Sequence, residues 1–275
     1  MNRILYDSHI HTHLCKHAIG APGEYAAAAE RRGLRGIIFT CHNPVPGDWS
    51  PEYRMELDEF DEYVALVART REEWLGRVDV RLGMEFDYIP GMKNWIETLM
   101  ERAQFQYRLG SVHAPITDYM ERFFYGDILR FQRIYFDHIA QAAETGLFHA
   151  IAHPDVVKHA IPSRWRVEEV MDELKRSLDC IAAAGTALEF NTSGANKIPS
   201  EMNPGREMLR EMKARDIPVV IGSDSHTPDR VGDRFEEAFD ALLEAGYRSV
   251  CYFIDGEKRE ISIEEAKASL LVHAV

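Results

Sequence analysis

The sequence predicts an α/β fold in which a mostly parallel sheet closes into a (β/α) barrel of seven units. Three observations support this prediction. Short apolar runs alternate with longer segments of helical periodicity seven times along the chain. Such alternation indicates parallel strands that are covered by helices. No linker rich in proline, glycine or serine divides the 275 residues, so we expect one domain over residues 1–275.

Each unit begins with an apolar run short enough to be a buried strand. The expected strands are Ile4–Asp7, Gly36–Thr40, Val78–Phe86, Tyr107–Ser111, Ala150–Ala152, Ala187–Phe190 and Val219–Gly222. After them the chain resembles a hairpin that turns at Asp255-Gly256, followed by a helix opened by a capping box at Ser262–Glu265.

A helical segment follows each strand, and several of these segments carry boundary signals. Pro22 and Pro51 suit a first helical position, and glycines such as Gly33 and Gly185 suit the residue just past a helix end. The expected helices are Pro22–Arg32, Pro51–Leu75, Met92–Arg102, Asp127–Thr145, Trp165–Ala184, Glu201–Arg215 and Asp229–Ala245.

The composition excludes several classes of partner. The formal net charge of −13 would repel a nucleic-acid backbone, so we expect no nucleic-acid partner. The first residues contain no apolar h-region, and no apolar run approaches 18 residues, so we expect no signal peptide, no membrane span and no membrane partner. Its four cysteines are widely spaced and form no CxxC pair, which indicates free thiols in a reducing, cytoplasmic compartment. The sequence gives no indication of oligomeric state.

A cluster of histidines near the start of the chain indicates a metal site. His9, His11, His13 and His17 lie within nine residues, directly after the first expected strand. Imidazole is the commonest metal ligand in proteins. His9 and His11 alternate on an extended segment and therefore point to the same side.

Further metal-type residues follow other expected strands. They are His42, Glu85, His113, His153, Asp224 and His226. The carboxyl ends of barrel strands meet on one face, where active sites are built. A single histidine after a strand is more often a polar loop residue than a ligand. The repeated placement at strand ends, however, favours one common site.

The number and type of these residues limit the metals that they could bind. A tetrahedral zinc uses three or four protein ligands. Seven of these histidines and the two carboxylates make nine candidates, which are too many for one ion and generous for two, and could serve three if a carboxylate bridges. Mixed imidazole and carboxylate ligands suit Zn, Fe or Mn. We expect Cys15 and Cys41 to be bystanders near the site.

The motifs resemble those of the polymerase and histidinol phosphatase (PHP) family, in order and over nearly the whole chain. They are Asp7-Ser-His-Ile-His11, Thr40-Cys-His42, Gly83-Met-Glu85, Gly110-Ser-Val-His113, Ala152-His-Pro154 and Gly222-Ser-Asp-Ser-His226. Further stretches, among them Glu189-Phe-Asn-Thr-Ser-Gly194, are similar to the histidinol-phosphatase branch.

The resemblance implies a distorted (β/α)7 barrel, similar to a TIM barrel, that holds three divalent metal ions. One ion would be held by His9, His11, Glu85 and Asp224. A second would be held by Glu85 as a bridge, His113 and His153. The third would be held by His17, His42 and His226. The remaining histidines fall outside this pattern: His13, His138, His149, His159 and His273.

The expected function is hydrolysis of a phosphate monoester, most specifically of L-histidinol phosphate in histidine biosynthesis. A hydroxide bridging two metals would attack the phosphorus. Asp224 is the candidate base, His226 a candidate acid, and Glu85 would set the metal spacing. The candidate phosphate contacts are Lys158, Arg164, Lys197 and Arg230, and the candidate partners for the substrate ammonium are Asp87 and Asp155.

Two alternatives stay open at this stage. One is a phosphatase of another small metabolite, such as a nucleotide or sugar phosphate. The other is a metal-binding module without turnover.

Overall fold

A computed structural model describes residues 3–271 and places them in one α/β domain built on a nine-stranded sheet. The strands lie in sequence order, and all neighbouring pairs are parallel except the last, β8 with β9. The strands are β1 Tyr6–Ile10, β2 Gly36–Phe39, β3 Asp79–Asp87, β4 Tyr107–Ser111, β5 Ala150–Ile151, β6 Ala187–Asn191, β7 Val219–Gly222, β8 Ser249–Ile254 and β9 Glu257–Ser262.

The first seven strands close into a barrel, as the sequence predicts. Ile10 at the end of β1 forms a parallel bridge with Ser225, just beyond β7. The His11 amide donates to the Ser225 carbonyl at 3.0 Å, and the Ser225 amide donates to the His9 carbonyl at 3.2 Å. This closure brings β1 and β7 together although they are more than 200 residues apart. The β8–β9 hairpin is appended beyond β7, and it turns at Asp255-Gly256 as expected.

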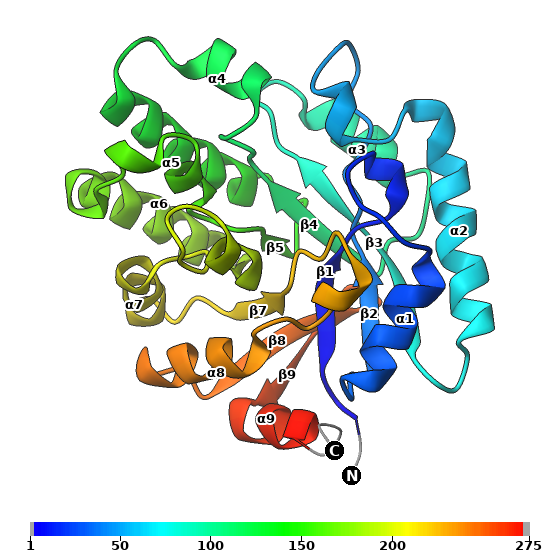
Figure 1. Cartoon of the computed structure of the whole chain (residues 1–275). Coiled ribbons are helices and arrows are strands. Elements are labelled where there is room, and N and C mark those ends of the chain that lie inside the picture. Colours follow the sequence, from blue (N-terminus) through cyan, green and yellow to red (C-terminus); the bar gives the residue numbers. More distant parts are fainter. Residues whose placement is uncertain (1–2, 272–275) are drawn as a thin grey trace.

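Helices surround the barrel, with α1 and α2 on one side and α5, α6 and α7 on the other (Figure 1). The helices are α1 Pro22–Arg31, α2 Phe60–Glu73, α3 Lys93–Met100, α4 Thr117–Phe123, α5 Ile128–Glu144, α6 Met171–Ala184, α7 Arg206–Ala214, α8 Phe235–Glu244 and α9 Ile263–Leu271. Of these, α4 was not predicted. Within the described residues, no helix has both the length and the apolar character needed to span a membrane.

Two apolar layers hold the fold together. Along β2, Ile37 and Phe39 belong to the large cluster that packs against the helices. Ile38 points to the opposite face and joins a smaller cluster with Tyr107 and Val220. Since successive strand residues alternate between faces, this smaller cluster fills the inside of the barrel.

The first strand runs further than expected. The prediction ended it at Asp7, because the polar residues that follow break the apolar run, but the structure continues β1 to Ile10. The Thr40 amide donates to the Ile10 carbonyl at 2.8 Å, so the extra residues are paired like any buried strand. His9 therefore lies within the strand itself.

Four helices begin later than their sequence patterns predict. Instead of starting at Pro51, Trp165, Glu201 and Asp229, they start at Phe60, Met171, Arg206 and Phe235. The preceding segments form irregular loops and 3₁₀ turns on the carboxyl side of the strands. Polar contacts draw two of these loops inward: Arg54 reaches Asp87, and Glu201 reaches Lys158. The helical periodicity of the local sequence cannot predict such long-range contacts.

Buried His138 on α5 should make stability depend on pH. Its Nδ1 lies 2.8 Å from the Tyr119 hydroxyl, and burial, with a smaller effect of Arg122, lowers the pKa of His138 to about 4. An unfolded chain protonates this histidine near pH 6.5, so the free energy of unfolding falls as pH drops from 7 toward 4.

In a His138→Gln variant we expect about 1–2 kcal/mol of the stability loss between pH 7 and pH 5 to disappear. Urea unfolding of both proteins at the two pH values measures this difference. An unchanged pH dependence of unfolding in the variant would contradict the lowered pKa of His138.

Candidate metal centre

The structure brings all nine predicted metal-site residues to one place at the carboxyl ends of the barrel strands. His9 and Glu85 lie within β1 and β3, and the others follow β1, β2, β4, β5 and β7 within a few residues. Neighbouring imidazole rings lie close together: the ring centroids of His11 and His226 are 4.0 Å apart, and those of His11 and His42 are 4.4 Å apart. The topology of the barrel therefore assembles the site that the sequence motifs predict.

Glu85 is at the centre of the cluster and is fully buried. Its Oε2 faces His42 Nδ1 at 2.9 Å and His9 Nε2 at 3.4 Å. Its Oε1 faces His153 Nε2 at 3.0 Å and His113 Nε2 at 3.3 Å. The two oxygens therefore point at different sets of imidazoles, as a carboxylate that joins two metal positions would.

His9, His11 and Asp224 form a second convergence next to Glu85. The His9 and His11 Nε2 atoms are 3.0 Å apart, and Asp224 Oδ1 lies 3.2 Å from His11 Nε2. Their ligand atoms all lie within 4.8 Å of one another. A buried charge is costly unless it is paired, so the Asp224 carboxylate and the two imidazoles need an interaction that offsets the cost of burying them together.

A third group lies nearer the surface and consists of His17, His42 and His226, whose ligand atoms are also mutually within 4.8 Å. The Nδ1 of His17 is 2.7 Å from the Cys15 carbonyl, and the Nδ1 of His226 is 3.1 Å from the Asp224 carbonyl. With Nδ1 as the donor in these two contacts, the Nε2 atoms carry the lone pairs. The Nε2 of His226 has no hydrogen-bond partner among the described residues.

Two site residues have unusual backbone conformations. His153 and Asp224 have positive φ values, +28° and +50°, although neither is a glycine. Such conformations cost free energy and cluster at functional sites. In both cases the conformation turns the side chain back over the end of the barrel just after a strand has ended.

Glu189 on β6 orients the His9 imidazole and holds the backbone of His153. Its Oε1 lies 2.7 Å from His9 Nδ1, and its Oε2 accepts from the His153 amide at 2.9 Å. A Cβ on Gly222 would collide with this carboxylate and with Cβ of His9, so glycine is required there. Glu189 belongs to one of the motifs named above but was not among the predicted site residues. It lies in the middle of β6, and its only local signal is a carboxylate between apolar strand residues.

Asp87 holds His113 in a similar way. Its carboxylate accepts from His113 Nδ1 and from the buried guanidinium of Arg54. Against the effect of burial, these two cations hold the pKa of Asp87 well below its usual value. Carboxylates that accept from the second imidazole nitrogen commonly fix metal-binding histidines. Arg54 was not predicted, because nothing in the local sequence indicates that it reaches the barrel end.

The electrostatics of the cluster favour ionised carboxylates and divide the imidazoles. Against the effect of burial, nearby carboxylates raise the pKa of His9 and His113. Burial by itself disfavours ionised Glu85, but the surrounding imidazoles more than compensate and hold the pKa of this carboxyl well below its usual value. Burial lowers the pKa of His42 to about 4, so this imidazole is neutral near pH 7. A neutral imidazole and an ionised carboxylate are the forms that bind metal.

The donor set fits divalent cations. Glu85 Oε2, His11 Nδ1 and His153 Nδ1 are buried and have no hydrogen-bond partner among the described residues. Among residues 3–271, the Glu85 carboxylate has no lysine or arginine partner, and its ion-pair contacts are all histidines. Convergent electron-pair donors without a matching cation are costly in a buried site. Bound metal ions would supply the positive charge that these groups lack.

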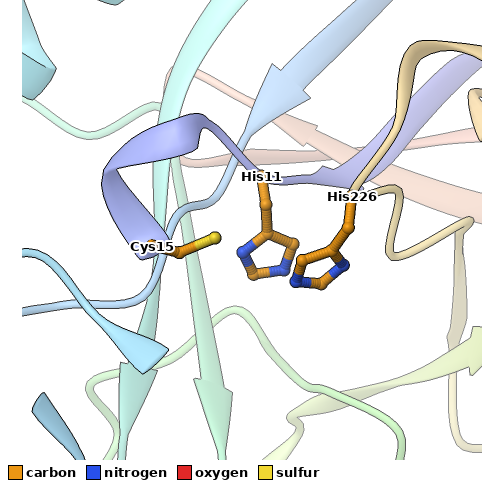
Figure 2. A group of neighbouring side chains, drawn as sticks. All are labelled: His11, Cys15 and His226. Carbon is orange, nitrogen blue, oxygen red and sulfur yellow. The ribbon is translucent and has the colours of Figure 1, made fainter. Parts of the chain in front are cut away.

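Cys15 lies closer to the cluster than a distant bystander would. Its sulfur is within 4.8 Å of ligand atoms of His11 and His226. Figure 2 shows the sulfur pointing toward the His11 ring, which stacks on the ring of His226. Contact with Cys41 and burial raise the pKa of the Cys15 thiol, which favours the neutral form over the thiolate that binds metal. That Cys15 and Cys41 are bystanders therefore stays a prediction.

The four predicted phosphate contacts have different surroundings. Lys197 Nζ lies 3.9 Å from Asp224 Oδ2, and Arg230 pairs with Asp233 at 3.0 Å and approaches Asn196 next to Lys197. These two residues lie beside the cluster. Arg164 is exposed and has no ion-pair partner in the described chain.

Lys158, one of the four predicted phosphate contacts, lies in the protein interior. Its side chain is fully buried, and its ammonium donates to Asp155 Oδ2 at 3.0 Å, Glu201 Oε2 at 3.1 Å and the Met202 carbonyl at 2.7 Å. All three of its N–H donors are thus used inside the protein. Asp155 Oδ2 also accepts from the Gly205 amide at 2.8 Å, whereas its buried Oδ1 has no hydrogen-bond partner among the described residues.

The other histidines have separate surroundings. His13 is exposed, and His149 stacks on Phe253 at 4.9 Å. His159 lies 2.9 Å from the Ile198 carbonyl and 3.0 Å from Asn203 Oδ1, so it holds the same loop as Lys158. His273 lies outside the described residues.

The fold and the site together define a barrel protein with a buried histidine–carboxylate centre whose side chains could hold metal. Residues 7–193 match the family model described as the PHP domain. A probable histidinol-phosphatase of Deinococcus radiodurans is 38% identical over 261 residues, which cover 90% of this chain and 96% of that protein. The chain belongs to the PHP domain family.

Other relatives agree with this assignment. The histidinol-phosphatase of Bacillus subtilis is 27% identical over 86% of this chain and 98% of its own length. Among solved structures, histidinol phosphate phosphatase from Lactococcus lactis, complexed with zinc, L-histidinol and phosphate, superimposes with a TM-score of 0.78. It is 20% identical and covers 93% of this chain and 98% of that chain, so it supports the fold.

Proposed function

We propose that this protein is a metal-dependent phosphate monoester hydrolase that acts on L-histidinol phosphate. The observation that carries the proposal is the convergence of seven histidines and two carboxylates around buried Glu85. The relatives that cover most of the chain are named histidinol-phosphatases, which favours this substrate over other phosphate esters.

The metal ligands that we propose follow the three groups in the site. His9, His11, Glu85 and Asp224 would hold one ion; Glu85, His113 and His153 would hold a second. His17, His42 and His226 would hold a third. The mixed ligand set suits Zn, Fe or Mn. Bound divalent cations would neutralise charge on the phosphoryl oxygens and acidify a water nucleophile.

Residues of the chain would supply the base, the acid and the contacts to the phosphate. Asp224 is our candidate base, and Ser193 Oγ orients it by donating to its Oδ2 at 2.9 Å. His226, whose Nε2 is unpartnered among the described residues, is our candidate acid for the leaving oxygen. Lys197 and Arg230 would contact the phosphate from beside Asp224, because guanidinium and ammonium groups match its charge and geometry.

The cellular setting is part of the proposal. The four cysteines are free thiols, which suits a reducing compartment. We therefore place the enzyme in the cytoplasm, where it would act in histidine biosynthesis.

A panel of phosphate esters tests the proposed function. The purified protein would be assayed with added Zn, Mn or Fe against L-histidinol phosphate, a nucleoside monophosphate and a sugar phosphate. We expect kcat/KM for L-histidinol phosphate to exceed the others by about a hundredfold, which corresponds to about 3 kcal/mol of preferential transition-state binding. A preference for nucleotide or sugar phosphates would overturn the substrate, and no hydrolysis of any ester would overturn the enzyme assignment.

A further inference from the structure

A second feature lies at the opposite end of the barrel from the candidate metal centre. The amino-terminal ends of β1, β2 and β3 and the carboxyl ends of α1 and α2 enclose an open hollow of about 810 Å³. Five arginines line it: Arg3, Arg35, Arg71, Arg77 and Arg81. Such a concentration of positive charge is unexpected in a chain with a net charge of −13.

Two of these arginines are neutralised by carboxylates in the hollow. Arg77 pairs with Glu30 through its Nε at 3.1 Å, and Arg81 pairs with Asp79 at 2.8 Å. These ion pairs leave the rest of the hollow positively charged.

The other three arginines have no carboxylate within 4.0 Å among the described residues. Arg35 Nε donates to the Tyr6 hydroxyl at 3.1 Å, and Arg3 donates to the Arg77 carbonyl at 3.3 Å. No hydrogen bond or ion pair engages the Arg71 side chain in residues 3–271. The hollow therefore presents about three unneutralised positive charges, a strong attraction for a multivalent anion.

A smaller hollow of about 380 Å³ adjoins the first, and the two share Arg71 and Leu75. Its lining includes Val64, Val67 and Leu82, so it is largely apolar. Leu75, at the junction, has 80% of its surface exposed. Leu75 therefore extends the apolar lining of the smaller hollow to the edge of the charged one.

We propose that the two hollows bind a polyphosphate that carries an apolar ring, the chemical class of the nucleoside di- and triphosphates. Guanidinium groups bind phosphate oxygens in a bidentate manner, which suits Arg3, Arg35 and Arg71. The apolar hollow beside Arg71 would receive the base. The volumes lie within the range of small-ligand sites. Because this site is at the other end of the barrel, its ligand would be distinct from the substrate.

Calorimetric titration of the metal-loaded protein with ATP, tripolyphosphate and AMP tests this inference. The same titrations of Glu85→Gln, in which the candidate metal centre is disrupted, would separate binding at the hollows from binding at that centre. The test variant is the double substitution Arg35→Gln/Arg71→Gln. The matched control is Arg31→Gln/Arg69→Gln, which removes the same charge from exposed positions on α1 and α2 that do not line either hollow.

We expect one ATP to bind per chain, AMP to bind more weakly, and the test variant to lose about a hundredfold in ATP affinity, about tenfold for each guanidinium. The control variant should stay within about twofold of the wild type, since exposed charges beyond the site act weakly. Circular dichroism and an unchanged hydrolysis rate would verify that the test variant is folded.

The absence of ATP binding at millimolar concentration would overturn the proposal, and so would equal ATP binding by the test variant and the wild type. Equal affinity for ATP and tripolyphosphate would overturn the role of the apolar hollow. None of these outcomes bears on the phosphatase assignment, because that function is measured at the other end of the barrel.

Discussion

Glu85→Gln should lower kcat/KM for phosphate ester hydrolysis about a thousandfold and remove most of the bound metal. The substitution keeps the size of the side chain but removes its negative charge and replaces one oxygen by an amide nitrogen. That nitrogen would face either His42 and His9 or His153 and His113, and in each case it would face a metal position. Loss of about 4 kcal/mol of transition-state stabilisation gives this factor.

Metal analysis and steady-state kinetics of the same preparation measure this result. Glu97→Gln on α3 is the control, because that carboxylate is 44% exposed and has a single distant pairing with Lys93 at 3.8 Å. The control should keep its metal and its rate. A Glu85→Gln protein with full metal content and near-normal kcat/KM would refute the central role of this carboxylate.

Lys158→Met should destabilise the folded protein by about 3–5 kcal/mol, because it removes one partner from a buried ion pair. The Asp155 carboxylate would stay buried with its charge uncompensated, and the Glu201 and Met202 acceptors would lose their donor. The Glu201 side chain is 37% exposed and can turn to water, so Asp155, at 2%, accounts for most of the effect.

Urea unfolding of the metal-loaded protein measures this change. Lys93→Met is the matched control, and we expect less than about 1 kcal/mol from this exposed lysine. Adding Asp155→Asn to Lys158→Met should recover part of the loss, since the uncompensated charge is then gone. If Lys158→Met were as stable as the control, Lys158 would have to be free rather than bonded inside the protein.

The barrel could be predicted because its signals are local. Apolar runs such as Val219–Gly222 mark buried strands, and the glycine after α6, Gly185, ends its helix with a positive φ. The starts of α1, α3 and α5 were predicted to within one residue, but those of α2, α6, α7 and α8 were not, since the loops before these four helices are shaped by partners elsewhere. Arg54 shows this: its backbone is extended because its guanidinium reaches Asp87, 33 residues away.

Most of the candidate site could be predicted from the sequence for a related reason. His42, His113 and His153 each come just after a strand, and the rule that strand ends of a barrel converge turns that position into proximity. Glu189 lies within β6 rather than after it. A carboxylate within an apolar strand has several explanations, and the contact of Glu189 with His9 spans 180 residues.

By itself, the sequence determined the order of strands and helices, the residue types able to bind metal, and their position at strand ends. These properties follow from the periodicity and chemistry of neighbouring residues. The tertiary structure decided which carboxylate lies between the imidazoles, that Lys158 is enclosed with Asp155, and that unpaired arginines meet at the far end of the barrel. Such pairings depend on distances across the closed barrel, and those distances exist only once the chain has folded.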